Sequence, residues 1–317
     1  MGKTGKTQSH PRLKKLRILV SVITLAFLST IILRTDLTAL EQALSRISWT
    51  ATICCLALVQ VQIVLSALRW RFTSRRLGQD ITPFKAIREY YVASLLNQTL
   101  PGGMGGDALR AWRMRGNEPG GWKQPAKAVI FERLSGQIAL MLVAMIGLSI
   151  WPSITSADLG THARHHFILA IMVIAAMALI IVWITRQKAA ESALREDLLN
   201  VFVRHNAWLL HASMSAAILF SYVATFFIAA QATGSNLPWI AGMTIIPFCL
   251  LAMLIPTGFG GWGTREAAAM ALWPTLGISS VDGLAASITY GWLSLVGAAP
   301  GIIFLVLTAL RKRPSVA

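Results

Sequence analysis

The sequence predicts an all-α integral membrane protein, with about six full transmembrane helices and two glycine-broken re-entrant segments in an inverted repeat. Three observations support this fold class. Apolar residues make up 55% of the 317 residues, charged residues make up 13%, and the mean hydropathy is +0.60. In soluble proteins, apolar residues average about 45–50% and charged residues about 25%. The basic residues lie mostly in short segments between apolar runs, and one glycine-rich phrase occurs twice.

The repeated phrase follows an apolar run in each half of the chain. It reads PGGMGGDALR over residues 101–110 and PTGFGGWGTR over residues 256–265, so corresponding residues lie 155 positions apart. Glycine-interrupted apolar segments at matching places in two halves are typical of a transport site formed by two broken helices. We therefore expect the chain to move a substrate across a bilayer.

The first predicted span covers residues 18–33, behind a basic leader over residues 1–16 that we place in the cytoplasm. No cleavage site of the A-x-A type follows this run, which favours a retained span over a signal peptide. Runs of about 17–25 apolar residues are long enough to cross the roughly 30 Å hydrocarbon core. The other predicted spans cover residues 50–68, 129–151, 167–183, 208–232 and 284–310.

Two further apolar stretches, residues 90–100 and 239–255, each lead into one copy of the phrase. We predict that they belong to re-entrant segments over residues 86–110 and 236–273. Irregular backbone at membrane depth needs protein or a water-filled cavity to satisfy its N–H and C=O groups. Both breaks are therefore expected to line one cavity.

The distribution of basic residues predicts the orientation. With this topology, 25 of the 29 Lys and Arg fall on one side, in residues 1–17, 69–88, 110–133, 186–204 and 311–313. The positive-inside rule then places both termini in the cytoplasm, including the tail over residues 311–317. The first break enters from the cytoplasmic side and the second from the outer side, so the two halves of this single membrane domain, residues 1–317, are expected to be inverted.

The two breaks supply the candidate substrate-binding residues. Glycines allow positive φ and a close approach of the backbone, so amides and a helix N-terminus can converge on an anion. An arginine adds a forked charge that suits phosphate. The candidates are Gly103, Gly105, Gly106, Asp107 and Arg110 in the first copy, and Gly258, Gly260, Gly261, Trp262, Arg265 and Glu266 in the second.

An arginine at membrane depth costs about 2.5–3.5 kcal/mol on insertion scales, so it needs a partner or water. Asp107 lies three residues before Arg110, and Glu266 is adjacent to Arg265, which makes both carboxylates expected partners. The candidate proton carriers are Glu89, Asp107, Glu132 and Glu266. Asn97, Gln98 and Arg133 are further candidates near the cavity.

Simpler interpretations of the same residues are open. Each Gly-Gly pair can be only a tight turn or a close helix contact. Arg110 begins a basic run with Arg113 and Arg115, which can anchor a loop to anionic headgroups. Most of the eleven tryptophans lie near predicted span ends, as interfacial residues do, and Trp262 is the exception.

No metal, cofactor or nucleic-acid partner is expected. Three cysteines cannot form a disulfide framework, and His162, His165 and His166 lack carboxylates at ligand spacing. The net charge of +16 is dispersed over short loops between spans. That placement favours membrane lipids as the anionic partner.

The phrases SLLNQTLPGGMGGDALRAWRM and IPTGFGGWGTREAA, in this order and between these spans, resemble the flippase-like membrane domain of the lysylphosphatidylglycerol synthase family. The resemblance covers roughly residues 14–310. It implies an inner-membrane protein of bacteria that moves a charged phospholipid between leaflets, or that serves hopanoid or polyprenyl-linked glycan pathways. The family's motifs fall on Pro101, Gly103, Gly105, Gly106, Asp107 and Arg110, and on Pro256, Gly258, Gly260, Gly261, Gly263, Arg265 and Glu266.

The expected function is that of a lipid flippase or lipid-linked precursor transporter, with an anionic phospholipid or a polyprenyl-linked lipid as its substrate. The aminoacyl-transferring domain of the synthases does not follow Leu310, so lipid aminoacylation is not expected. Two alternatives are a membrane-embedded enzyme that acts on a lipid headgroup, and an accessory subunit that presents lipid to a glycosyltransferase or a lipid-modifying enzyme. No activated nucleophile or metal constellation favours the enzyme.

Overall fold

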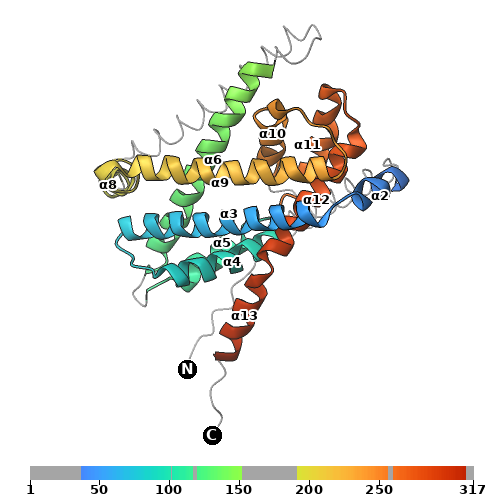
Figure 1. Cartoon of the computed structure of the whole chain (residues 1–317). Coiled ribbons are helices and arrows are strands. Elements are labelled where there is room, and N and C mark those ends of the chain that lie inside the picture. Colours follow the sequence, from blue (N-terminus) through green and yellow to red (C-terminus); the bar gives the residue numbers. More distant parts are fainter. Residues whose placement is uncertain (1–36, 101, 117–119, 152–190, 256–259, 312–317) are drawn as a thin grey trace, which may run out of the picture.

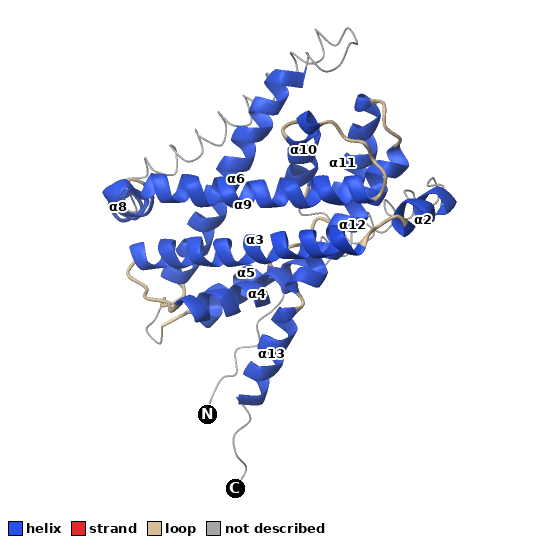
Figure 2. Ribbon diagram, in the orientation of Figure 1, coloured by secondary structure: helices blue, strands red, loops and turns tan. Residues whose placement is uncertain are grey.

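The computed structural model describes residues 37–100, 102–116, 120–151, 191–255 and 260–311, and the elements in these residues are helices joined by turns (Figure 1; Figure 2). Four helical segments are long and apolar enough to cross a membrane: Trp49–Arg76, Lys123–Ile150, Arg204–Ala232 and Ser280–Thr308. The all-helical class is thereby confirmed. The predicted spans over 18–33 and 167–183, the leader over 1–16, the tail beyond residue 311 and Gly258 lie outside the described residues, and the full count of six spans stays a prediction.

The first half of the chain contains α2 (Leu37–Ser45), α3 (Trp49–Arg76), α4 (Pro83–Thr99), α5 (Gly105–Arg113) and α6 (Lys123–Ile150). The Ser48 hydroxyl accepts a hydrogen bond from the Ala51 N–H and caps α3. α3 continues to Arg76, beyond its predicted end at Leu68. Arg69 therefore lies within α3 and not beyond its end, and the side of the membrane on which it lies stays a prediction.

The second half contains α8 (Glu191–Phe202), α9 (Ala207–Ala232), α10 (Ile245–Ala252), α11 (Thr264–Leu272), α12 (Ser280–Ala298) and α13 (Pro300–Arg311), with short 3-10 turns over Arg204–Asn206, Trp239–Gly242 and Trp273–Leu276. The predicted span 284–310 corresponds to the candidate span Ser280–Thr308, and its helix is interrupted at one residue, Ala299. α12 ends at Ala298 and α13 begins at Pro300, because proline lacks an N–H to continue a helix and is accepted in a first turn.

Each glycine phrase folds the chain back into a helical hairpin. In the α4–α5 hairpin, a β-carbon on Gly106 would lie 2.1 Å from the Ala93 carbonyl oxygen. In the α10–α11 hairpin, Gly261 has φ +85°, and a β-carbon there would lie 2.7 Å from the Met253 Cβ. Only glycine allows such approaches. The two predicted re-entrant segments are thus helical hairpins, and their depth in a bilayer stays a prediction.

The two hairpins meet at their glycines. A β-carbon on Gly260 would lie 2.6 Å from the Gln98 Cα, and one on Gly103 would lie 3.6 Å from the Gly260 Cα. The Gln98 amide also donates to the Ser294 carbonyl of α12 at 3.3 Å. The two breaks, far apart in sequence, therefore lie against each other.

The first long helices of the two halves, α3 and α9, lie side by side and run antiparallel (Figure 1). Gln62 donates to the Thr225 hydroxyl at 3.0 Å, and Arg69 donates to the Ser215 hydroxyl at 2.8 Å, so rising numbers in α3 meet falling numbers in α9. α3 packs against α6 and α12, and α9 packs against α12 and α6. An inverted repeat requires this antiparallel, reciprocal packing of equivalent helices.

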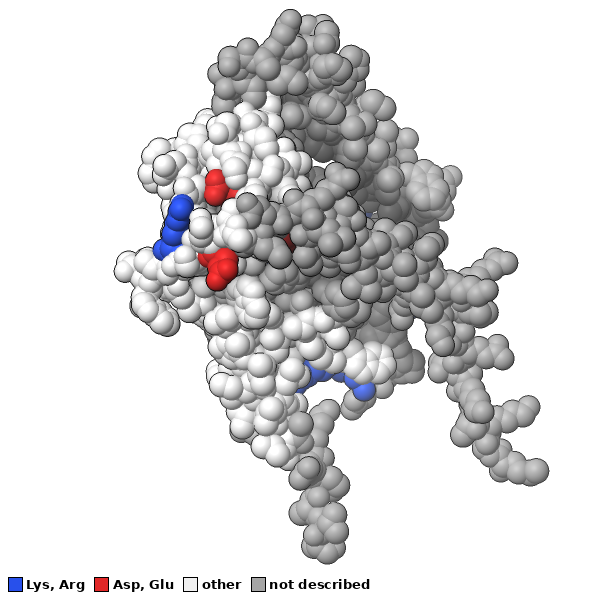
Figure 3. All heavy atoms as spheres, turned by 90° about the vertical axis from the view of Figure 1, so that its right-hand side faces the viewer, with Lys and Arg blue, Asp and Glu red and all other residues white. Residues whose placement is uncertain are grey.

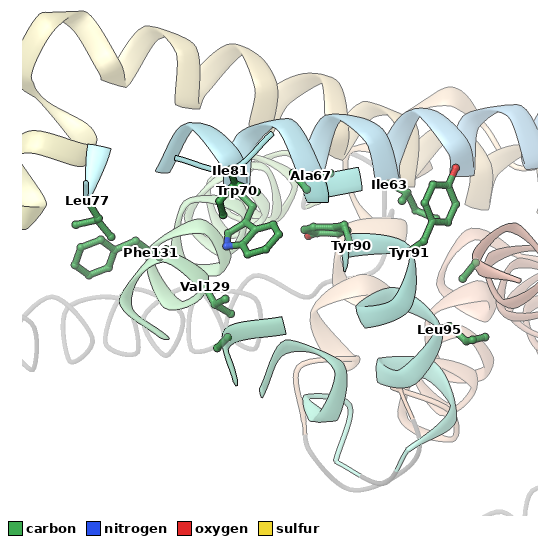
Figure 4. Packing of buried hydrophobic residues seen from close by; sticks show 14 of the residues in the cluster. Ile63, Ala67, Trp70, Leu77, Ile81, Tyr90, Tyr91, Leu95, Val129 and Phe131 are labelled. Atoms are coloured by element: carbon green, nitrogen blue, oxygen red, sulfur yellow. The ribbon is translucent and has the colours of Figure 1, made fainter. Parts of the chain in front are cut away.

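Apolar side chains fill two buried clusters and also cover the outside. One cluster lies between α3, α4 and α6 and includes Trp70 and Tyr90 (Figure 4), and the other surrounds Trp273. On the outside, Phe220 is 71% exposed. Figure 3 shows a face on which the described Lys, Arg, Asp and Glu are confined to a few spots. An apolar exterior of this kind suits contact with lipid chains.

The inverted arrangement predicts which loops an impermeant maleimide reaches. Lys123→Cys and Thr275→Cys, both at exposed positions, are placed singly in a chain without its native cysteines. In intact cells the reagent is expected to label residue 275 fully, whereas residue 123 reacts only after permeabilisation, because the basic loops stay in the cytoplasm. Labelling of residue 123 from outside would contradict the inverted repeat.

The α4–α5 contact predicts the effect of one methyl group. Gly106→Ala is expected to lower the free energy of unfolding by about 1–3 kcal/mol, because the added carbon overlaps the Ala93 backbone. Gly116→Ala is the control, since a β-carbon there has no atom within 4 Å. Thermal unfolding of both purified variants measures the difference, and equal melting temperatures would mean that the two helices do not pack at Gly106.

Candidate functional site

Arg110 of α5 lies in a buried chain of five alternating charges, which we call the ion-pair chain: Arg69, Glu132, Arg110, Asp107 and Arg133. Glu132 accepts from Arg69 Nη2 at 2.7 Å through Oε1 and from Arg110 Nη2 at 2.8 Å through Oε2. Asp107 Oδ1 lies 2.9 Å from Arg110 Nη2, and its Oδ2 lies 2.7 Å from Arg133 Nη2. The chain thereby ties α3, α5 and α6 together.

The ion-pair chain runs from the interior to the surface. Glu132 is 0% exposed, Arg110 1% and Arg69 4%, whereas 42% of the Arg133 side chain is exposed. Buried ions of this kind persist only when they are paired and hydrogen-bonded, because removing one partner leaves an uncompensated charge. Arg133 is therefore the member of the chain that a solute or lipid headgroup can reach.

Two aromatic rings complete the surroundings of Arg110. Its Cζ lies 4.9 Å from the centre of the Trp70 ring and 4.5 Å from that of the Tyr90 ring, both within cation–π range. The Tyr90 hydroxyl donates to Glu132 Oε1 at 3.3 Å. Figure 4 shows Trp70 of α3 and Tyr90 of α4 together below α3. Side chains of three helices, α3, α4 and α6, thus position the Arg110 guanidinium.

Two other polar candidates, Asn97 and Glu89, lie outside the ion-pair chain. Asn97 Oδ1 accepts from the amides of Gly106 at 2.8 Å and Asp107 at 3.3 Å, which caps the start of α5. Glu89 is buried in a neighbouring set, with Arg88 at 2.8 Å and Arg113 at 3.1 Å. Asn97 is therefore a helix cap, and Glu89 is paired outside the chain.

The second phrase forms a smaller centre. Arg265, 1% exposed, donates to Glu266 Oε1 at 2.6 Å and to the Ser287 hydroxyl at 2.9 Å. Glu266 Oε2 accepts from the Gly263 amide at 2.5 Å and so caps α11. The Arg265 Cζ lies 5.1 Å from the Trp262 ring and 5.0 Å from the Tyr290 ring.

The centre around Arg110, formed by the ion-pair chain, and the centre around Arg265 have corresponding arrangements. Arg110 bonds Glu132, and Arg265 bonds Ser287, in both cases 22 residues further along and in the next long helix. One turn beyond each acceptor a glycine makes room for a guanidinium. A β-carbon on Gly136 would lie 2.9 Å from Arg69 Nη2, and one on Gly291 would lie 2.3 Å from Arg265 Nη2. The acceptor is charged in the first centre and neutral in the second.

The structure separates the predicted site residues by role. Gly103, Gly105, Gly106, Gly260 and Gly261 lie at the breaks and at the contacts between helices, and Trp262 contacts Arg265. Sequence reasoning missed Arg69 and Ser287 as members of the centres. For Ser287 a signal existed, because it lies 155 residues after Glu132.

The backbone amides that we expected to bind an anion have partners within the protein, at Gly106, Asp107 and Gly263. Several side-chain donors at the first centre lack a partner. Within the described part of the chain, the buried Nε of Arg69, Arg110 and Arg133, Nη1 of Arg110, Nε1 of Trp70 and Nδ2 of Asn97 have no hydrogen-bond partner. Most of these unpartnered donors belong to guanidinium groups.

No three His, Cys, Asp or Glu side chains lie close enough to hold a metal ion in the described residues.

No curated protein matches the chain. The family described as the lysylphosphatidylglycerol synthase TM region matches residues 16–301, which is nearly the whole sequence. That family is a membrane domain connected with phospholipid metabolism, in agreement with the apolar helices described above. The chain belongs to the lysylphosphatidylglycerol synthase TM-region family and is an integral membrane protein.

Proposed function

We propose that this protein is a lipid flippase or lipid-linked precursor transporter, and not an enzyme, that binds an anionic headgroup between its two glycine–arginine motifs. The observation that carries the proposal is the contact between two glycine-broken hairpins, one from each half, that each bury an arginine near the contact. Broken helices from paired repeats are the usual source of a substrate site in transporters.

The charges and the surface support this proposal together. A headgroup that crosses the membrane must leave water, so it needs a polar path lined by compensating charges. Arg110 and Arg265 provide one buried cation in each half. The apolar outer surface would keep acyl or prenyl chains in the lipid while the headgroup passes inside.

In this proposal, Gly103, Gly105, Gly106, Gly258, Gly260 and Gly261 form the break, and Asp107, Arg110, Trp262, Arg265 and Glu266 surround the headgroup. Four carboxylates are proposed proton carriers: Glu89, Asp107, Glu132 and Glu266. Each of them is paired with an arginine. Protonation of such a carboxylate would release its arginine to the anion, which would couple a proton to lipid binding.

The proposed setting is the bacterial inner membrane with both termini in the cytoplasm. A glycosyltransferase or a lipid-modifying enzyme that uses the transported lipid is the proposed partner. Such a partner would act on the lipid before or after its headgroup crosses the membrane.

Arg110→Ala and Arg265→Ala are expected to reduce translocation of fluorescent phosphatidylglycerol in proteoliposomes by at least about tenfold, since each removes a charge-assisted bond of about 1.5–3 kcal/mol. Arg110→Ala leaves Glu132 paired with Arg69, and Asp107 paired with Arg133, so the variant should fold. Arg→Lys should restore little, because an ammonium cannot replace the guanidinium fork.

Arg75→Ala is the matched control, because Arg75 is 57% exposed and pairs with Asp80 at 3.6 Å. It is expected to transport at the wild-type rate. Monodisperse elution and an unchanged helix signal identify the folded variants. If folded Arg110→Ala and Arg265→Ala both transport at the wild-type rate, the proposed headgroup path is refuted.

A further inference from the structure

The hydroxyl of Ser287 on α12 closes a ring of hydrogen bonds with the ion pair of α11. It accepts from Arg265 Nε at 2.9 Å and donates to Glu266 Oε1 at 3.0 Å. The same Oε1 accepts from Arg265 Nη2 at 2.6 Å. Ser287 is fully buried, and a hydrogen bond to a charged group is stronger in the interior than in water. The hydroxyl therefore ties both members of the pair to α12.

Two further residues of α12 surround the same guanidinium. The centre of the Tyr290 ring lies 5.0 Å from Arg265 Cζ, and a β-carbon on Gly291 would lie 2.3 Å from Arg265 Nη2. Residues three and four positions after Ser287 share its face of the helix. The ring and the glycine give the guanidinium its space, and the Ser287 hydroxyl supplies the hydrogen bond that sets its direction.

The second centre keeps the arginine of its glycine phrase and lacks the other charges of the ion-pair chain. At the 155-residue offset, the equivalents of Arg69, Asp107, Glu132 and Arg133 are uncharged: Ala224, Trp262, Ser287 and Ile288. In the described residues, the ion pair of Arg265 is with Glu266, so the pair is neutral. A carboxylate at position 287 would add a buried charge without a second arginine to balance it. A hydroxyl accepts the hydrogen bond and adds no charge.

From this ring of bonds we propose that Ser287 is a positioning residue, whose hydroxyl holds the Arg265 guanidinium in the orientation that transport requires. The inference rests on the proposed function and adds to it a residue that acts through Arg265. Without the hydroxyl, Arg265 Nε loses its acceptor in a buried position, which is unfavourable. Of the bonds described, the one from Nη2 to Glu266 then remains, and the guanidinium can turn about it.

Ser287→Ala removes the hydroxyl and should lower the rate of fluorescent phosphatidylglycerol translocation in proteoliposomes by about tenfold or more, the size expected for one hydrogen bond to a charged group. Thr289→Val is the matched control. Thr289 lies on the same helix and is 3% exposed, and its hydroxyl has no hydrogen-bond partner in the described residues. The control should transport at the wild-type rate, and equal losses in the two variants would overturn the inference.

Two comparisons separate the orientation of Arg265 from packing. Ser287→Thr keeps the hydroxyl and should restore most of the rate that Ser287→Ala loses. In the Arg265→Ala background, Ser287→Ala should cause no further loss, because the hydroxyl then has no guanidinium to orient. An equal loss in folded Ser287→Thr and Ser287→Ala, or a further loss in the double variant, would overturn the inference. The double variant decides the question if Ser287→Thr does not fold.

The outcomes separate this inference from the proposed function. If folded Ser287→Ala transports at the wild-type rate while Arg265→Ala loses transport, the inference is overturned and the transporter is upheld. If folded Arg110→Ala and Arg265→Ala both transport at the wild-type rate, the proposed function is refuted together with the inference.

Discussion

The arrangement of the first half depends on the pairing of charges that are buried among apolar helices. Glu132 is fully buried and bonds two arginines from different helices, Arg69 of α3 and Arg110 of α5. Loss of Glu132 leaves Arg69 and Arg110 without their shared carboxylate in a buried position, where an uncompensated charge costs several kcal/mol. The carboxylate of Glu132 thus fixes α3, α5 and α6 relative to one another. The rings of Trp70 and Tyr90 pack against the Arg110 guanidinium, and Gly136 leaves room for that of Arg69.

Each half of the chain contains the same arrangement, in which a glycine phrase is followed by a buried arginine. Gly106 and Gly261 let the short helices fold back onto α4 and α10, which brings Arg110 and Arg265 into the interior. Each arginine then finds an acceptor on the next long helix. The halves differ in that acceptor, which is the carboxylate of Glu132 in the first half and the hydroxyl of Ser287 in the second, and the first half has two further arginines, Arg69 and Arg133, in the same cluster.

Local patterns predicted the helical class, the two breaks, their meeting and the Arg265–Glu266 pair, because those features depend on apolar runs, glycines and neighbouring residues. The partnership of Arg69 with Glu132 was not predictable in that way, since the two are 63 residues apart and only the tertiary fold joins them. Arg69 directly follows an apolar run, where it resembles a loop charge. The division at Pro300 was hidden for a related reason, because hydropathy continues across the proline.

A double-mutant cycle on Arg110→Gln and Glu132→Gln tests the central claim that this buried pairing holds the helices together. Thermal or denaturant unfolding of the four purified proteins gives the free energies of unfolding. Glu132→Gln alone should cost about 3–5 kcal/mol, because it leaves two arginines without their shared carboxylate. The double variant should lose less than the sum of the single losses, by about 1 kcal/mol or more. Additivity to within about 0.5 kcal/mol would show that the two charges do not stabilise each other and would contradict the account.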